Sequence, residues 1–239
     1  MESALLNGKV DTLATENLLE PSELSRPGLP TNRASDVVAE QLRRMIVTLA
    51  LPPGAIVTQS DLMIRLNCGR TPLREALQRL SEEYLVIPVP GGGISIASLN
   101  VHDFVEVIEA LVVVESLSAR LAARRITDGQ VSKLGEIVDS AEEANREGEF
   151  SNVARLDFEF HNFIGQATHN RYLADTIARL HRVATRFGYL AWQRERNAST
   201  SLQEHRQILA ALQSQDAANA EQLTREHTLK SRDRIVAVL

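Results

Sequence analysis

The stretch RTPLREALQRL, residues 70–80, combines apolar residues at helical spacing with basic residues toward its N-terminal end. Leu73, Leu77 and Leu80 recur at helical spacing, so the pattern predicts a helix that turns these leucines inward. Pro72 falls in the first turn, where a helix tolerates a residue without an N–H group. The stretch is therefore expected to form an amphipathic helix.

The flanking segments complete a recognisable order of elements. An apolar stripe with helical spacing runs through residues 34–49, and Thr58 and Asp61 can cap a short helix that follows. After the amphipathic helix, residues 85–89 and 94–96 form two short β-like runs on either side of consecutive glycines. Helix, short helix, turn, helix and hairpin is the layout of a winged helix-turn-helix.

Basic side chains lie at the N-terminal end of the amphipathic helix. Arg70 and Arg74 would meet base edges if this helix entered the major groove, and a guanidinium fork can pair with guanine through two hydrogen bonds. Free backbone N–H groups at the same end favour a phosphate. We expect Thr71, Arg44 and the wing residue Gly92 to make further DNA contacts. A solvated arginine face on a small helical domain is the alternative.

Composition places the chain among ordinary globular proteins. Its 239 residues are 44% hydrophobic and 24% charged, and the formal net charge of −5 argues against a generally basic, nucleic-acid-coating protein. No apolar run approaches the roughly 20 residues that a membrane helix needs, so we expect no membrane span. With a single cysteine and no secretory signal pattern, a reducing cytoplasm is the expected location.

The remainder of the chain is helical by pattern. From Asn100 onward the apolar residues keep helical spacing and no strand is convincing, so we expect an all-helical bundle. The expected helix-capping residues are Ser35 or Asp36, Asn100, Thr127, Ser151, Ser201 and Asp216, and Gly148 is expected to end a helix.

The predicted fold class is mainly α, with three parts. Residues 1–33, interrupted by prolines, are interpreted as a flexible tail. Residues 34–97 are expected to form a winged helix-turn-helix with a small β-hairpin wing. Residues 98–239 are expected to form an all-α helical domain.

Four residues of the helical region form a candidate metal site. Asp157 and His161 stand four apart, so both side chains leave one face of a helix. His205 and His227 lie on two later helices, and a bundle can direct such groups to one point. Three imidazoles and one carboxylate suit Zn²⁺, Ni²⁺, Mn²⁺ or Fe²⁺, whereas one carboxylate is too few for Ca²⁺. A surface ion pair between the aspartate and the histidine is the alternative.

The N-terminal pattern resembles the DNA-binding domain of GntR-family bacterial transcription regulators. The matching segments are LPPG at residues 51–54 and the helix at residues 70–80. In that family the arginines at the positions of Arg70 and Arg74 contact the operator, so the resemblance implies binding to double-stranded DNA. The chain departs from the family pattern at three positions, Gly69, Ser60 and Tyr84.

Residues 100–239 are similar to the C-terminal FCD domain of the FadR-type branch of that family. Its metal-binding members carry an Asp-x₃-His pair and two later histidines, which here are Asp157, His161, His205 and His227. The resemblance implies a metal, with Zn²⁺ as the first candidate, that lines a cavity. It also implies that a small carboxylate metabolite, such as an organic or sugar acid, binds there and rearranges the DNA-binding domains of a homodimer.

The resemblance leaves the effector contacts open. Many family members carry an arginine near the pocket at the position where this chain has Leu111. An effector carboxylate would then need another partner, either the metal itself or Arg186. His181 is a further candidate for contact with the effector.

The favoured function is a metabolite-responsive bacterial transcription regulator, acting as a repressor on a pseudopalindromic operator. A regulator that senses the metal itself would use the same residues. A metal-dependent hydrolase or lyase would need a general base beside the metal. Glu159 and Glu204 are nearest in sequence to the ligands, but their helical positions direct them elsewhere, so we do not expect an enzyme.

Overall fold

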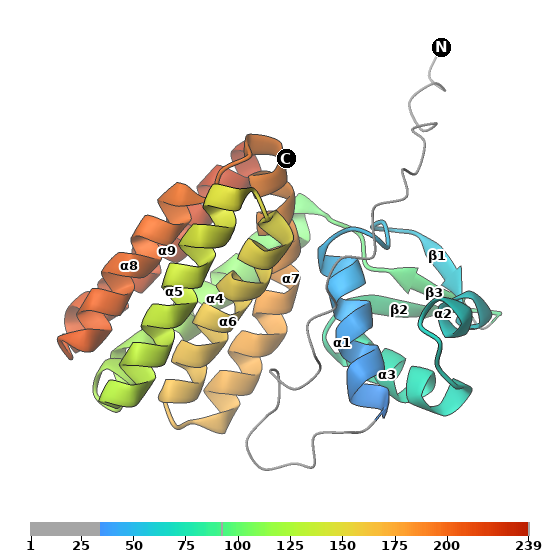
Figure 1. The fold of residues 1–239 in the computed structure, drawn as a ribbon, viewed down its shortest axis with the longest axis horizontal. Helices are drawn as coiled ribbons and strands as arrows, with labels where there is room; N and C mark the ends of the chain where they lie inside the picture. Colours follow the sequence, from blue (N-terminus) through green and yellow to red (C-terminus); the bar gives the residue numbers. More distant parts are fainter. Residues whose placement is uncertain (1–33, 92, 239) are drawn as a thin grey trace.

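The computed structural model describes residues 34–91 and 93–238, which form an N-terminal and a C-terminal lobe (Figure 1). One cluster of buried apolar side chains lies entirely between residues 38 and 96. Two further clusters lie between residues 104 and 235. The predicted tail, residues 1–33, lies outside the described residues.

The N-terminal lobe is the predicted winged helix-turn-helix. Its elements are α1 (Ala34–Val47), β1 (Ile56–Thr58), α2 (Gln59–Arg65), α3 (Arg70–Glu82), β2 (Val86–Val89) and β3 (Gly93–Ile96). Leu73, Leu77 and Leu80 of α3 are buried, as the spacing predicts. Thr58 caps α2 by accepting a hydrogen bond from the N–H of Asp61, which confirms the expected cap.

The three strands form one antiparallel sheet in the order β1-β3-β2. Strands β2 and β3 make the predicted wing hairpin, with Ile87 opposite Ser95. The sequence pattern does not predict β1, which pairs with the other edge of β3 and places Ile56 opposite Ser95. A strand of three residues is too short to show an alternating pattern, so its pairing becomes visible only in the fold.

Asp36 ties α1 to α3 and does not cap a helix. Ser35 and Asp36, the expected capping residues, both lie inside α1, so that prediction is wrong. The Asp36 carboxylate pairs instead with Arg79 of α3. Arg79 of α3 therefore forms an ion pair that links two helices of the N-terminal lobe.

The described part of the C-terminal lobe is all-helical, as predicted. Its elements are α4 (Val101–Ala123), α5 (Asp128–Glu147), α6 (Phe150–Ala167), α7 (Arg171–Glu195), α8 (Ser199–Gln213) and α9 (Ala217–Val238). Helix α7 lies next to the N-terminal lobe and contacts α1 (Figure 1). Within residues 34–91 and 93–238, no helix combines the length and apolarity that a membrane crossing requires.

Most of the predicted helix ends of this lobe are confirmed. The side chains of Asn100 and Asp216 accept from backbone N–H groups at the starts of α4 and α9, and Thr127 forms a capping box with Gln130. Gly148 ends α5 with φ of 75°, a conformation that favours glycine.

Two predicted caps are wrong. Helix α6 begins at Phe150, so Ser151 already lies inside it. Helix α8 begins at Ser199, so Ser201 likewise lies in the first turn. A serine within the first turn has the same local sequence character as a capping serine, and helix ends are the least predictable part of an element.

Candidate metal centre

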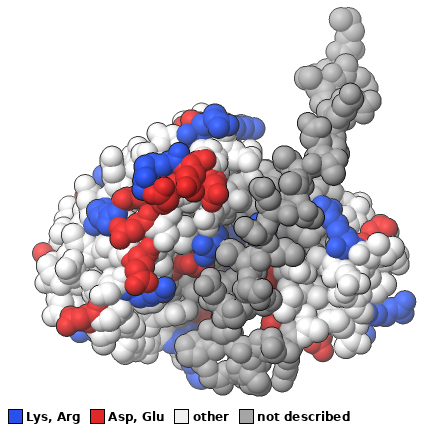
Figure 2. Space-filling model, in the orientation of Figure 1, with Lys and Arg blue, Asp and Glu red and all other residues white. Residues whose placement is uncertain are grey.

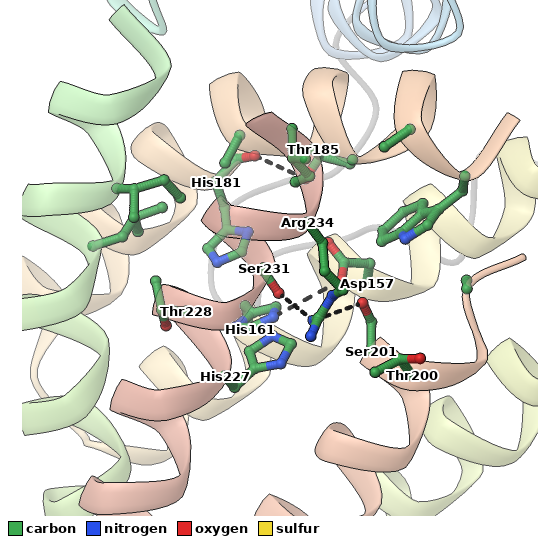
Figure 3. A pocket seen from close by; sticks show the side chains of 18 of the residues that line it. Asp157, His161, His181, Thr185, Thr200, Ser201, His227, Thr228, Ser231 and Arg234 are labelled. Atoms are coloured by element: carbon green, nitrogen blue, oxygen red, sulfur yellow. Dashed lines mark hydrogen bonds and ion pairs between the residues drawn. The ribbon is translucent and has the colours of Figure 1, made fainter. Parts of the chain in front are cut away.

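The four predicted ligands meet inside the helical lobe. Asp157 and His161 come from α6, His205 from α8 and His227 from α9. His205 Nε2 lies 3.2 Å from His227 Nε2 and 3.7 Å from Asp157 Oδ1. His161 Nε2 lies 3.9 Å from the same Asp157 oxygen. Figure 3 shows Asp157, His161 and His227 together beside a cavity.

The spacing and chemistry of this group fit a transition metal ion. Ligand atoms about 2.0–2.2 Å from a tetrahedral Zn²⁺ lie roughly 3.3–3.6 Å from one another, which is close to the separations found here. All four side chains are buried, with exposed fractions of 8% for Asp157 and 4% or less for the histidines. Buried polar groups need partners, and a shared cation would satisfy all four.

Two carboxylates behind the imidazoles fix their orientation. His227 Nδ1 lies 2.7 Å from Glu204 of α8, and His161 Nδ1 lies 2.8 Å from Glu115 of α4. Because each Nδ1 is engaged, each Nε2 is left to face the ligand group. Sequence reasoning missed both partnerships, since each joins residues on different helices.

Burial and neighbouring charges give the histidines different protonation states. Burial, reinforced by His227 and His161, holds the pKa of His205 well below its usual value. Burial also lowers the pKa of His227. For His161 burial alone would lower the pKa, but Glu115 and Asp157 outweigh it, so the pKa is raised. His205 and His227 therefore offer free lone pairs at neutral pH, whereas His161 holds its second proton more tightly.

Glu204 lies beside a predicted ligand, contrary to the expectation that it would point elsewhere. That expectation considered one helix only, and the packing of α9 against α8 brings His227 to it. Arg234 donates to both Glu204 oxygens, at 2.9 and 2.7 Å. Burial alone would raise the pKa of Glu204, but His227 and Arg234 lower it to about 2. A carboxylate so occupied is a poor general base.

A cavity of about 80 Å³ opens beside the ligand group. Leu111 and His181, both predicted near the effector, line its wall. His181 Nε2 contacts Glu115, while its buried Nδ1 has no hydrogen-bond partner among the described residues. One ring nitrogen of this cavity-lining histidine is therefore left without a partner among the described residues.

Arg186, the other predicted effector contact, is not among the residues that line this cavity. Only 1% of Arg186 is exposed, and its Nη2 donates to the carbonyl oxygen of Ala97, between the lobes, at 2.5 Å. Burial lowers the pKa of Arg186 to about 10, and its Nε has no partner among residues 34–91 and 93–238. The structure places this guanidinium at the junction of the lobes.

The predicted DNA-contacting residues of the helices are on the surface. Arg70, Thr71 and Arg74 are exposed at the start of α3, whose first turn holds no acidic residue. Arg44 is exposed in the last turn of α1. Gly92 lies outside the described residues.

Part of the helical lobe carries charges of both signs. Figure 2 shows acidic and basic side chains interleaved over α5 and α8. Arg206 of α8 lies 2.8 Å from Asp139 and 2.6 Å from Glu142 of α5. This face is a solvated ion-pair surface and differs from the basic start of α3.

Each lobe matches a known protein family model. Residues 34–96 match the family model described as bacterial regulatory proteins, gntR family, and residues 106–230 match the FCD domain. The HTH-type transcriptional repressor RspR of Escherichia coli is 28% identical over 204 residues, which cover 83% of this chain and 87% of RspR. The repressor GlaR of the same organism is 29% identical over 203 residues, covering 79% and 89%.

A solved structure shares the fold. The E. coli McbR/YncC structure superposes with a TM-score of 0.78 at 19% identity, covering 86% of this chain and 98% of that one. The matched family and the named relatives are transcription regulators, so the hydrolase or lyase alternative has no support. The chain belongs to the GntR family of bacterial transcription regulators, in the FadR-type branch that carries a C-terminal FCD domain.

Proposed function

We propose that this protein is a metabolite-responsive repressor that binds a pseudopalindromic operator as a homodimer and is controlled by a small acid bound near a metal ion. One observation carries the proposal: Asp157, His161, His205 and His227 converge beside a cavity in the helical lobe. In this proposal residues 34–97 bind DNA, and residues 98–239 bind the metal and effector and form the dimer.

The start of α3 supports the DNA-binding role. Arg70 and Arg74 are one helical turn apart, both are exposed, and neither has an ion-pair partner among the described residues. Their guanidinium groups are therefore available for guanine, while the N-terminal N–H groups of α3 favour a phosphate. Thr71 and Arg44 are also exposed, and we assign them to contacts with the DNA backbone. The names of RspR and GlaR favour repression over activation.

Helix α4 supports the homodimer. Val113 and Leu117 are 65% and 43% exposed on one face of α4. Glu109 lies on the N-terminal side of this apolar pair and Arg120 on the C-terminal side, and both are exposed. Two copies of α4 packed antiparallel about a two-fold axis would bury the apolar pair and bring Glu109 near Arg120 of the other copy. The surface is thus self-complementary.

The ligand group supports a transition metal, with Zn²⁺ preferred over Ni²⁺, Mn²⁺ and Fe²⁺. Three imidazoles and one carboxylate suit these ions, and tetrahedral geometry suits Zn²⁺ best. A bound divalent ion would supply a positive charge that attracts a carboxylate. The adjoining cavity is small, and its lining includes Leu111 and His181, whose Nδ1 has no partner among the described residues. A small organic or sugar acid fits this environment.

The test is metal analysis and native mass spectrometry of gently purified protein. We expect a dimer with about one transition metal ion per chain, as a closed four-ligand site would bind. Asp157→Ala and His205→Ala should each lose the metal, whereas His102→Ala, an exposed histidine on α4, should retain it. Unchanged metal content in both ligand variants would refute the metal-based part of the proposal and leave DNA binding standing.

A further inference from the structure

Arg234 and two serines line the cavity next to the metal-ligand group, because Arg234 and His227 contact the same oxygen of Glu204. Arg234 Nη2 donates to Ser231 Oγ at 2.9 Å and to Ser201 Oγ at 3.2 Å, and all three residues line the cavity. Figure 3 shows the guanidinium reaching in between these hydroxyls and the metal-ligand group. Both serine oxygens accept from Arg234, so each serine keeps its own proton to donate.

The positive charge of Arg234 is already matched. Its Nη1 and Nη2 donate to the two oxygens of Glu204, a paired arrangement that holds a carboxylate firmly. Among the described residues that line the cavity, Arg234 alone carries a guanidinium or ammonium group. Glu115, Asp157 and Glu195 add carboxylates to the same wall. Apart from the proposed metal ion, a ligand carboxylate near Arg234 would therefore meet the Glu204 carboxylate and no side-chain cation that lacks a partner.

Part of the cavity wall is apolar. Phe104, Ile108 and Leu111 of α4 line it, together with Ala184 and Ala191 of α7. The cavity thus offers one polar end with hydrogen-bond donors and little net charge, and one apolar side.

We propose that Arg234, Ser201 and Ser231 form a hydroxyl-binding subsite, so that the effector is a small hydroxylated monocarboxylate and not a dicarboxylate. The inference rests on the proposed function, because it places the acid group of the ligand at the metal and its hydroxyl groups at the neighbouring Arg234 and serines. A hydroxyl oxygen accepts from the two serines without adding a charge. Glu204 determines this preference, because it neutralises Arg234.

The experiment is calorimetry on the full-length, Zn²⁺-loaded protein with three four-carbon acids: 3,4-dihydroxybutanoate, butanoate and succinate. We expect the dihydroxy acid to bind about tenfold more tightly than butanoate, since one hydrogen bond to a charge-supported site has about that value. Succinate should bind no better than butanoate. Binding of none of the three acids would overturn the proposed effector function together with this subsite.

Two variants separate the subsite from general acid binding. Ser231→Ala should reduce the difference in affinity between the dihydroxy acid and butanoate. Ser132→Ala is the control and should leave this difference unchanged, because the Ser132 hydroxyl donates to the carbonyl oxygen of Asp128 in its own helix. Glu204→Gln should free the charge of Arg234 and raise succinate affinity relative to the dihydroxy acid, with zinc content measured in parallel. Acid binding with no hydroxyl preference, and with no change in Glu204→Gln, would overturn the subsite and leave the proposed function intact.

Discussion

Arg182 Nε of α7 lies 3.3 Å from Glu83 Oε2, and Glu83 is the residue at the C-terminal end of α3. Glu83 also accepts two hydrogen bonds of 2.7 Å from Arg43 of α1. The residue next to Arg182 is His181, which contacts Glu115 beside the cavity. Adjacent residues of α7 thus touch the cavity and the helix that carries Arg70 and Arg74.

Because α7 contacts both the cavity and α3, a movement of this helix can couple ligand binding in the cavity to DNA binding by α3. A ligand that forms a hydrogen bond with Nδ1 of His181 would favour one position of α7. The Arg182–Glu83 ion pair would transmit that shift of α7 to α3. Coupling of this kind typically changes affinity by about 5–150-fold.

Arg182→Gln should loosen this connection. We expect faster amide hydrogen exchange in α1 and α3, with little change in α8 and α9, because the lost contact joins α7 to the N-terminal lobe. Arg171→Gln is the matched control, since Arg171 lies at the exposed start of the same helix and contacts Tyr172. Equal exchange in the Arg182 variant and the parent protein would show that the pair does not hold the lobes together.

Arg186→Met should stabilise the protein. The buried guanidinium of Arg186 has a backbone carbonyl as its partner, and replacing a buried charge with an apolar side chain of similar size stabilises by about 1–3 kcal/mol in comparable cases. Urea unfolding measures the change. Arg194→Met is the control, because Arg194 also donates to a backbone carbonyl, at Val238, but is exposed. A net loss of stability in Arg186→Met would mean that the Ala97 contact outweighs the cost of burying the charge.

The exposed apolar face of α4 gives a direct test of the proposed dimer. Val113→Glu places a charge on the exposed apolar surface and should convert the dimer to monomer at micromolar concentration, because the other copy would have to bury that charge. Sedimentation measures the outcome. Glu143→Gln, on the exposed face of α5, should leave the association state unchanged. A dimer that survives Val113→Glu must use another surface.

Much of the fold follows from patterns that extend over several turns. The leucine spacing of α3 and the capping residues Thr58, Asn100 and Thr127 agree with the structure because these signals are local. The sequence pattern does not predict strand β1, because its stability comes from pairing with β3 and not from its own three residues.

The candidate metal ligands are proposed by the residue pattern, and the family resemblance favours the same four residues. Spacing places Asp157 and His161 on one face, but the meeting of α6, α8 and α9 depends on packing. Glu204 shows the limit most clearly, since its own helix directs it away from His205 while α9 supplies His227 and Arg234 as partners. Local geometry does not reveal a contact between two helices.

Arg74→Ala should weaken specific operator binding. A bidentate contact with guanine contributes about 1–3 kcal/mol, so affinity for the operator should fall by that amount while non-specific binding changes little. Arg79→Ala is an informative companion, because Arg79 pairs with Asp36 and should affect stability more than base preference. Fluorescence anisotropy with operator and scrambled duplexes measures both. Undiminished specificity in Arg74→Ala would mean that α3 does not read the major groove.

Metal uptake should release protons, and the number released should fall as pH rises, because ligands must be deprotonated before they bind. Glu115 and Asp157 raise the pKa of His161 against the effect of burial, so His161 is the histidine ligand that keeps its proton to the highest pH and is the main source of the release. The lowered pKa values of His205 and His227 mean that these rings are already neutral and release none. Calorimetric Zn²⁺ titrations in two buffers of different ionisation enthalpy give the number of protons released per metal ion bound. As pH rises well above neutral the release should fall toward zero, since His161 then loses its proton before the metal arrives. Release of two or three protons at pH 7 would show that the other histidines are charged in the metal-free protein.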